Sequence, residues 1–419
     1  MWLGAGTLLV LSILFLQVGE PSYAQQTTVI VAKTVLDGRG KILHNEPILV
    51  EGEKIVRVGG PIPAGAVVYN LGSLTVSPGL IDVHDHILWH FDNGRYAPKG
   101  EPADQAILHA VDNAIVTLNA GFTTIQSPGS PEDKYLRDAI ARGTIPGPRI
   151  LTSLEPLHDT SGSPEKIREL VRERKQQGAD FIKIFASNAN PVSNPVADND
   201  PKAHTMTQEQ IEAACGEAKK LGMRTIVHVH VASIAKVATL AGCTSIEHGG
   251  FVTDDVFQLM AEHGTYYDPN IGLVLQNYDV NKDKYIGIGG YTAVGIANMV
   301  KEEGPTFESF RRSLKIKGLK IIYGTDAVAG AHGRNGEEFI SRVKEGQRAM
   351  DALISATSLS ASSLGMGNQI GSIEPGMQAD IIAFDGDPLT NPEAILRVAF
   401  VMKGGKIYKN LVPSSGTDR

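Results

Sequence analysis

The sequence has little cysteine and no excess of positive charge. Two cysteines occur in 419 residues, Cys215 and Cys243, too few for a disulfide framework. Both lie in apolar contexts, where a free buried thiol is the usual state, so we assign them no role. The formal net charge is −7 and no lysine or arginine cluster occurs, which argues against nucleic acid as a partner. The remaining composition, 42% hydrophobic and 20% charged, is that of a globular protein.

Long apolar runs are also scarce, and the exception opens the chain. MWLGAGTLLVLSILFLQVG precedes Glu20 and Pro21 and is slightly shorter than the roughly 20 residues of a bilayer span. Small residues at Ser22 and Ala24 fit signal-peptidase cleavage after Ala24. No basic residue precedes the run, so an uncleaved membrane anchor is the alternative. We expect a signal peptide over 1–24, export to the periplasm or secretion, and no stable membrane span after cleavage.

The middle of the chain alternates short apolar segments with helical patterns. One helical pattern opens with Thr207 and Gln210 at capping-box spacing and closes at Gly222. Eight strands alternating with helices predict a (β/α)8 TIM barrel, and a doubly wound open sheet is the competing architecture. The eight predicted strands are LIDVHDH (80–86), FTTIQS (122–127), RILTS (149–153), FIKIFAS (181–187), RTIVHVH (224–230), TSIEHG (244–249), TYYDPN (265–270) and LKIIYGTDA (319–327).

Both ends of the mature chain read as short strands and turns instead. An open sheet leaves these ends unexplained, whereas a barrel with one small β-sandwich domain built from both termini accounts for them. The predicted boundaries are 25–78 for the N-terminal part of the small domain, 79–368 for the barrel and 369–419 for the C-terminal part.

Polar residues gather where the predicted strands end, which is where the active site of a barrel lies. Two histidines that are two residues apart in a strand point to the same face. Taken singly, each would more often be a structural core residue. Together they make a buried cluster that needs counter-charges, which a pair of divalent cations supplies. The members are His84, His86, Lys183, His228, His230, Glu247, His248, Thr325 and Asp326.

These motifs resemble the metal-dependent amidohydrolase superfamily, of the urease and dihydroorotase kind. The matching segments are PGLIDVHDH, FIKIFAS, VHVH, SIEHGG, YGTDA, EPGMQADIIAFDGDP and VMKGGKIY, and the resemblance covers nearly all of the mature chain. ARGTIPGPRI (141–150) and AHGRN (331–335) are most similar to the imidazolonepropionase-related branch, which contains Xaa-Pro and Xaa-Arg dipeptidases and carboxypeptidase-like amidases.

The resemblance implies a role for each ligand. One ion is held by His84, His86 and Asp326. The second is held by His228 and His248, and Lys183, carboxylated by CO2, bridges both. Imidazole and carboxylate ligands favour Zn2+. A hydroxide shared by the two ions attacks the carbonyl, and Asp326 is the catalytic residue that passes its proton to the departing amine.

The residues that follow His228, the histidine of the fifth predicted strand, indicate the reaction class. Deaminases of the superfamily typically lack the strand-four lysine and carry a glutamate shortly after this histidine. Here Val229, His230 and Val231 follow it and Lys183 is present. We therefore expect hydrolysis of an amide bond in a small-molecule dipeptide or N-acyl amino acid. The alternative reaction is hydrolysis of a lactone, a carbamate or a cyclic imide. A further alternative is that the protein is a catalytically inactive metal-binding relative. Whether the chain forms a homo-oligomer is left open.

Four residues are predicted to contact substrate. His230 lies two residues beyond His228 on the same face. His158, after strand three, and Tyr267, on strand seven, are expected to line the pocket. Arg334, in the loop after strand eight, would pair with a substrate carboxylate in a bidentate manner, the alternative being an exposed loop charge.

Overall fold

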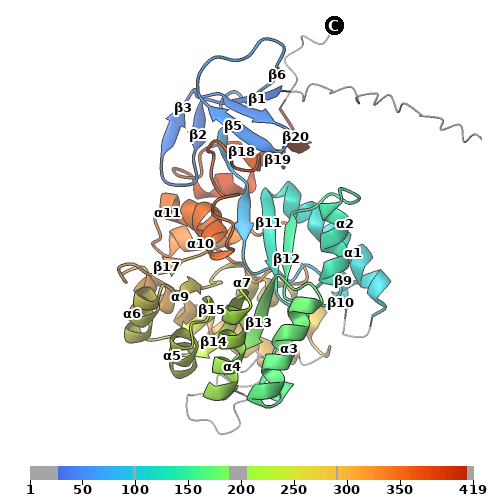
Figure 1. Cartoon of the computed structure of the whole chain (residues 1–419), viewed down its shortest axis with the longest axis vertical. Helices are drawn as coiled ribbons and strands as arrows, with labels where there is room; N and C mark the ends of the chain where they lie inside the picture. The colour runs from blue at the N-terminus through green and yellow to red at the C-terminus, as the bar shows by residue number, and fades with distance from the viewer. Residues whose placement is uncertain (1–26, 98–100, 188–204, 289–290, 413–419) are drawn as a thin grey trace, which may run out of the picture.

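The computed structural model describes residues 27–97, 101–187, 205–288 and 291–412. The predicted signal peptide, 1–24, lies outside the described residues. Within those ranges, no helix is both long and apolar enough to cross a lipid bilayer. Figure 1 shows a body of strands from both chain ends packed on a larger α/β body.

The α/β body contains the eight predicted strands, all parallel to their neighbours. They form two sheets, in the orders β12-β11-β8 and β13-β14-β15-β16-β17. Single bridges, Leu157 with Ile184 and Asp85 with Ala327, lie where the two sheets meet. The fold is thus of the TIM-barrel type, although the strand ladders do not form one continuous closed sheet. The strands are β8 (Leu80–Asp82), β11 (Phe122–Ser127), β12 (Arg149–Thr152), β13 (Phe181–Phe185), β14 (Arg224–Val231), β15 (Ser245–Phe251), β16 (Tyr266–Asp268) and β17 (Lys320–Ile321).

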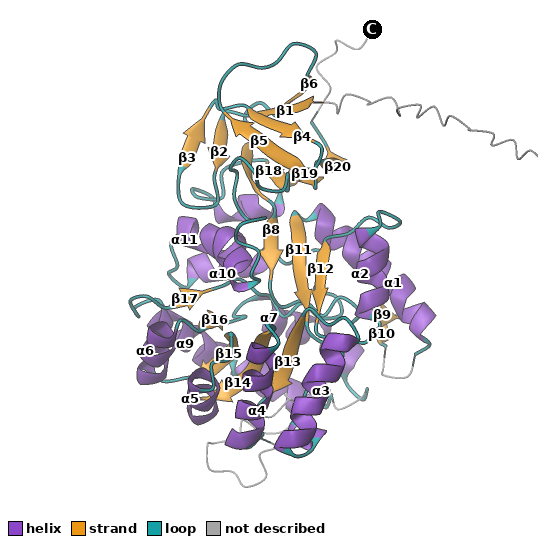
Figure 2. Cartoon of the chain, in the orientation of Figure 1, coloured by secondary structure: helices purple, strands orange, loops and turns teal. Residues whose placement is uncertain are grey.

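Helices follow most of these strands and cover their outer faces (Figure 2). The predicted capping box is present, because Thr207 Oγ1 accepts from Gln210 N at 3.3 Å and Gln210 Oε1 accepts from Thr207 N at 2.8 Å. The helices are α1 (Ala103–Asn119), α2 (Asp133–Ala141), α3 (Pro164–Gln176), α4 (Gln208–Lys220), α5 (Ala232–Leu240), α6 (Asp254–His263), α7 (Leu273–Tyr285), α8 (Ala293–Lys301), α9 (Glu303–Ser313), α10 (Glu337–Lys344), α11 (Ala349–Ile354) and α12 (Ser360–Ser363).

Apolar side chains on the strands pack against the surrounding helices. Ile182, Val227 and Ile246 belong to an outer cluster that includes residues of the surrounding helices. Ile81, Val83 and Ile322 belong to a second cluster with α12. Because these layers immobilise the strands, the polar residues at their carboxyl ends are held on a rigid frame.

The terminal strands form two further sheets around one shared apolar cluster. Their orders are β5-β4-β1-β6 and β20-β19-β18-β7-β2-β3. Because β18 pairs with β7, strands from the two chain ends lie in the same sheet. The strands are β1 (Thr27–Val31), β2 (Thr34–Leu36), β3 (Ile42–His44), β4 (Ile48–Glu51), β5 (Lys54–Val58), β6 (Val67–Asn70), β7 (Thr75–Pro78), β18 (Ile381–Phe384), β19 (Val398–Lys403) and β20 (Lys406–Asn410). The remaining pair is β9 (Phe91–Asp92) and β10 (Arg95–Tyr96), a hairpin whose second strand contacts α7.

The prediction of two free thiols is wrong. Cys215 on α4 and Cys243, just before β15, are joined by a disulfide with Cα atoms 5.2 Å apart. Both half-cystines are buried, and α4 packs against α5 and β14. This packing brings together two residues that are 28 positions apart in the chain, a proximity that cysteine spacing alone does not reveal.

Candidate active site

The extension of β8 presents two histidines on one face, as alternation predicts. The His84 and His86 rings lie 5.3 Å apart. Asp85, between them, points the other way, where it accepts from Asn335 Nδ2 at 3.0 Å and lies 3.2 Å from His332 Nε2. The pair of imidazoles is therefore fixed by strand geometry.

All six predicted metal ligands meet at this point. Asp326 Oδ1 lies 3.4 Å from His84 Nε2 and 3.2 Å from His86 Nε2. Lys183 Nζ lies 3.3 Å from His84 Nε2. The His248 ring is 5.2 Å from that of His84 and 4.5 Å from that of His228. Six residues from five strands or strand ends thus converge on one buried centre.

Two of these residues have left-handed backbone, which alternation does not predict. The φ angles are 68° at His248 and 51° at Asp326. Non-glycine residues adopt this conformation rarely, and it concentrates at functional sites. At His248 it turns the ring inward even though the preceding residue, Glu247, also faces the cluster. Two consecutive side chains of β15 therefore serve the same centre.

Glu247 and Asp268 are buried partners of His84; the sequence places Glu247 in the polar cluster but predicts a role for neither residue. Glu247 Oε2 lies 3.1 Å from His84 Nδ1, and Asp268 Oδ2 lies 3.9 Å from it. Asp268 is itself held by Gly324 N at 2.7 Å. A carboxylate on the far nitrogen of an imidazole fixes the tautomer that leaves Nε2 free to bind metal. Alternation places Tyr266 and Asp268 on one face of β16 and Tyr267 on the other, but it does not show which face points inward.

A buried network behind the site, equally unpredicted, joins the first and eighth strands. Asp82 Oδ2 accepts from Thr325 Oγ1 at 2.6 Å and from Asn335 Nδ2 at 2.7 Å. Its Oδ1 accepts from His84 N at 3.0 Å. One carboxylate therefore positions the backbone next to His84 and next to Asp326.

The lowered pKa values of the cluster, and its imidazole nitrogens without hydrogen-bond partners in the described part of the chain, favour the binding of metal ions. Burial lowers the pKa values of His84, His228 and His248, which keeps these imidazoles neutral and able to donate a lone pair. Burial also lowers the pKa of Lys183. His86 Nδ1 and His228 Nε2 are buried and have no hydrogen-bond partner among the described residues. Ligand atoms of His84, His248 and Asp326 lie within 4.8 Å of one another, so the donor set fits divalent cations.

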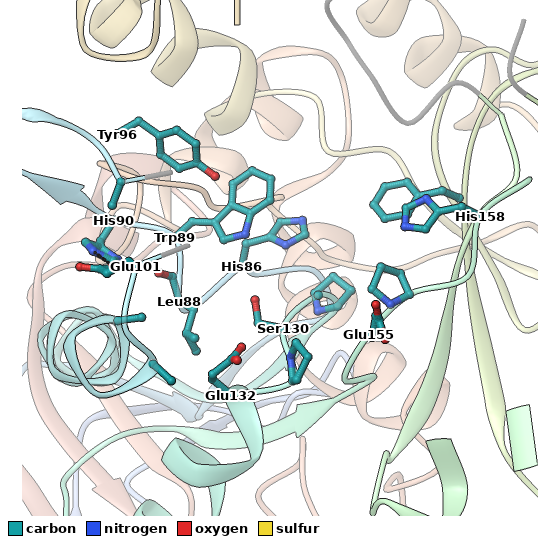
Figure 3. A pocket seen from close by; sticks show the side chains of 18 of the residues that line it. His86, Leu88, Trp89, His90, Tyr96, Glu101, Ser130, Glu132, Glu155 and His158 are labelled. Carbon is teal, nitrogen blue, oxygen red and sulfur yellow. Dashed lines mark hydrogen bonds and ion pairs between the residues drawn. The ribbon is translucent and has the colours of Figure 1, made fainter. Parts of the chain in front are cut away.

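A cavity of about 720 Å³ opens beside His86. Its walls include the aromatic rings of Trp89, Tyr96 and Phe185, and acidic side chains such as Glu132 (Figure 3). None of its described lining residues is lysine or arginine. The volume is in the range of small-molecule sites.

One predicted substrate residue lines this cavity, and a second lies beside the metal cluster. His158 lines the cavity and stacks on Phe185, with ring centroids 4.9 Å apart (Figure 3). His230 stacks on His248 at 5.2 Å, on the same side as His228.

Like His230, the other two predicted substrate residues are not among the described residues that line the cavity. Tyr267 is fully buried, packs on Phe257 at 4.9 Å, and donates its hydroxyl to His248 O at 2.9 Å. It lies on the opposite face of β16 from Asp268, so it faces the helices. Arg334 makes a bidentate ion pair with Glu337, at 2.9 and 2.7 Å, so its guanidinium is already engaged.

Comparison with known proteins decides the family. The model of the amidohydrolase family matches residues 75–408, which include the whole cluster. The chain belongs to the amidohydrolase family. It is a hydrolase that acts on amide bonds, as the sequence predicts.

Solved structures and a curated relative agree with this assignment. A Xaa-Pro dipeptidase crystallised with methionine in its active site is 30% identical, with a TM-score of 0.82, covering 92% of this chain and 100% of its own. A prolidase in complex with N-methylphosphonate-L-proline is 27% identical, with a TM-score of 0.82, covering 92% of this chain and 100% of its own. Ochratoxinase of Aspergillus niger is 24% identical over 92% of this chain and 87% of its own length.

Proposed function

We propose that this amidohydrolase binds two divalent ions, Zn2+ by preference, and cleaves the amide bond of a dipeptide or N-acyl amino acid. The observation that carries the proposal is the convergence of four imidazoles, Lys183 and Asp326 in one buried centre. Such a set is costly to bury without cations. When bound, a pair of divalent ions lowers the pKa of water and polarises a carbonyl oxygen.

The ligands divide into two sets around Lys183. His84, His86 and Asp326 would hold one ion, and His228 with His248 the other. Because burial lowers its pKa, Lys183 is more readily the free amine that CO2 captures; Nζ forms the new N–C bond and loses a proton. The resulting carbamate would be anionic and would add oxygen donors to the two sets of ligands.

Asp326 is the proton carrier of the reaction. Its Oδ1 lies at the centre of the cluster, near His84 and His86. From there the carboxylate accepts the proton released when water adds to the carbonyl, and it returns that proton to the nitrogen of the departing amine. His230 and His158 are placed to contact the substrate beside the centre, while Tyr267 positions His248 through its backbone carbonyl.

The substrate class is supported by the relatives and by the cavity. The dipeptidase, the prolidase and ochratoxinase are similar to this chain over more than nine-tenths of its length. The cavity volume suits a small molecule, and its rings suit an apolar or aromatic side chain. A lactone, a carbamate or a cyclic imide would be attacked in a similar way, so these compounds belong in the same test.

We also infer the domain organisation of the chain and its export. The single bridges at both gaps support one closed (β/α)8 barrel over 79–368. The shared apolar cluster supports a small β-sandwich of 25–78 and 369–419. The Cys215–Cys243 disulfide supports export, because such bonds persist in oxidising compartments.

The test is a hydrolysis screen of zinc-loaded chain from Gln25 onward. We expect free amino acid to be released from some dipeptides or N-acyl amino acids. Lys183→Ala should lose that activity and bind fewer zinc ions, and Lys344→Ala on α10 is the matched control. If Lys183→Ala retained both turnover and full zinc content, the binuclear assignment would be wrong. Activity restricted to lactones, carbamates or imides would replace the substrate class and keep the metal centre.

A further inference from the structure

The two histidines at the end of β8 are supported in different ways. His84 Nδ1 faces the buried carboxylate of Glu247 at 3.1 Å. His86 Nδ1 is also buried, but within the described ranges it has no hydrogen-bond partner. A metal-binding imidazole is usually oriented through its second nitrogen. The ring of His86 therefore needs another kind of support to hold Nε2 toward Asp326.

The edge of the His86 ring that carries Nδ1 faces Gly129 in the wall of the cavity. A Cβ atom on Gly129 would lie 3.1 Å from His86 Nδ1 and 3.4 Å from Cε1. Such a contact is tighter than most side chains tolerate, so this position has no room for a side chain that could orient the ring. The support must come from the face of the ring or from the backbone of His86.

Trp89 supports the face of the ring. Its backbone N–H donates to His86 O at 2.8 Å, which closes a tight turn. The turn places the indole on the imidazole, with ring centroids 4.4 Å apart and an interplanar angle of 24° (Figure 3). Asn113 on α1 holds the turn, because its Nδ2 donates to Ile87 O at 2.9 Å and to Trp89 O at 3.1 Å. Stacking on a fixed indole restricts the plane of the His86 ring.

His332 supports the backbone. It lies in the loop between β17 and α10, and its Nε2 is 3.1 Å from His86 O. A carbonyl oxygen can only accept, so Nε2 carries a hydrogen and donates it. Asp85 Oδ1 lies 3.2 Å from the same nitrogen, and the His332 side chain is only 2% exposed. His332 thus joins the backbone of His86 to the segment that follows Asp326, another member of the cluster.

We propose that Trp89 and His332 are positioning residues that hold His86 as a metal ligand, in place of the carboxylate that orients His84. The inference rests on the proposed function, in which His86 and Asp326 bind the same ion. Trp89 fixes the plane of the imidazole, and His332 fixes the carbonyl from which the Trp89 turn begins. The two residues therefore act on the same ligand from two sides.

The role of Trp89 is tested by a pair of variants. Trp89→Phe keeps a flat ring on His86, whereas Trp89→Leu removes it. Zinc affinity of the full chain is measured by competition with a colorimetric chelator. We expect Trp89→Leu to weaken zinc binding about tenfold or more, and Trp89→Phe to stay close to the wild type. Tyr291→Leu is the matched control, because Tyr291 lines the same cavity but packs on Tyr96, at 5.6 Å. Wild-type affinity in Trp89→Leu would overturn the role of the indole.

The role of His332 is tested by rescue. His332→Gln keeps a side-chain N–H donor, and His332→Leu removes it. We expect His332→Leu to weaken zinc binding about tenfold or more, while His332→Gln and the exposed control His263→Leu stay close to the wild type. Urea unfolding of the metal-free chains reports the stability lost when Asp85 loses its neighbour. If His332→Gln lost as much zinc affinity as His332→Leu, the N–H donor would not be what holds His86.

Crystal structures of the metal-free chains test the positioning without zinc. The His86 ring should keep its orientation in the wild type, in Trp89→Phe and in His332→Gln. In Trp89→Leu and His332→Leu it should adopt other rotamers. An unmoved ring in both leucine variants would overturn the proposal, even if their zinc affinity fell. A wild type that binds no zinc would instead refute the proposed metal centre, and the ring orientation would still decide whether Trp89 and His332 position His86.

Discussion

His84 has more partners than any other residue discussed at the centre. Its backbone N–H donates to Asp82, its Nδ1 faces Glu247, and its Nε2 faces Asp326 and Lys183. The ring is therefore oriented from behind by a buried carboxylate and offers its other nitrogen to the centre. Positioning of this kind is what a metal ligand requires.

Removing the charge behind His84 should weaken metal binding. Glu247→Gln keeps an acceptor for Nδ1–H but loses the negative charge. We expect zinc affinity to fall roughly 10–100-fold, as at comparable positions in metalloenzymes, with kcat/KM falling in parallel. Zinc titration by calorimetry measures this, and Glu262→Gln, exposed on α6, should have no effect. An unchanged affinity would show that Glu247 does not orient the ligand.

Asp133 makes stability depend on pH. Burial raises its pKa to about 7, while hydrogen bonds from Ser127 and Thr152 oppose the rise. The folded state therefore retains the proton between pH 4 and 7, where the unfolded chain has lost it. The free energy of unfolding should fall as pH rises through this window, by on the order of 4 kcal/mol from this group, and level off above pH 7.

Asp133→Asn should remove that dependence. Urea unfolding at pH 5, 6, 7 and 8 would show a smaller fall than in the wild type. Asp138→Asn, more exposed on the same helix, should follow the wild-type curve. Parallel curves for Asp133→Asn and the wild type would contradict the expectation.

At the scale of elements, the sequence predicts where strands lie better than how they end. Continuous apolar runs indicate buried parallel strands, and all eight are found where expected. The side-chain directions of His84 and His86 follow from alternation alone. The inward turn of His248 does not, because it depends on a left-handed backbone that the apolar pattern does not indicate. Tyr267 and Asp268 show the same difficulty, since choosing the inner face of a three-residue strand requires knowing its register.

The disulfide between α4 and the start of β15 could not be predicted, because it depends on helix packing. Constraining a loop of 28 residues should stabilise the fold by about 3–4 kcal/mol in the chain-entropy description. The double variant Cys215→Ala/Cys243→Ala should therefore unfold at lower urea, and dithiothreitol should lower the wild-type midpoint while leaving the double variant unchanged. A wild-type midpoint that is insensitive to dithiothreitol would count against the bond.

For the whole molecule, one ion pair joins the terminal sheets to the barrel strands. Arg149 Nη1 on β12 lies 2.8 Å from Asp380 Oδ2, just before β18, and Gly404 N donates to Asp380 Oδ1 at 2.7 Å. The Asp380 side chain is 2% exposed and that of Arg149 27%. The sequence predicted that both ends of the chain form one unit, but not this contact, because the partners are 231 positions apart.

Breaking the pair from the arginine side should destabilise the assembled fold. Arg149→Met leaves a buried carboxylate without its counter-charge, for which the full cost is about 3–5 kcal/mol; since Arg149 is partly exposed, we expect about 2–3 kcal/mol in urea unfolding. The double variant Arg149→Met/Asp380→Asn should recover part of the loss, because the uncompensated charge is then gone. Arg137→Met removes the pairs with Asp138 and Asp180, whose side chains are 48% and 33% exposed and stay solvated without the arginine, and it should cost less than about 1 kcal/mol. If Arg149→Met and Arg137→Met were equally mild, the terminal sheets would be held to the barrel by apolar packing rather than by this ion pair.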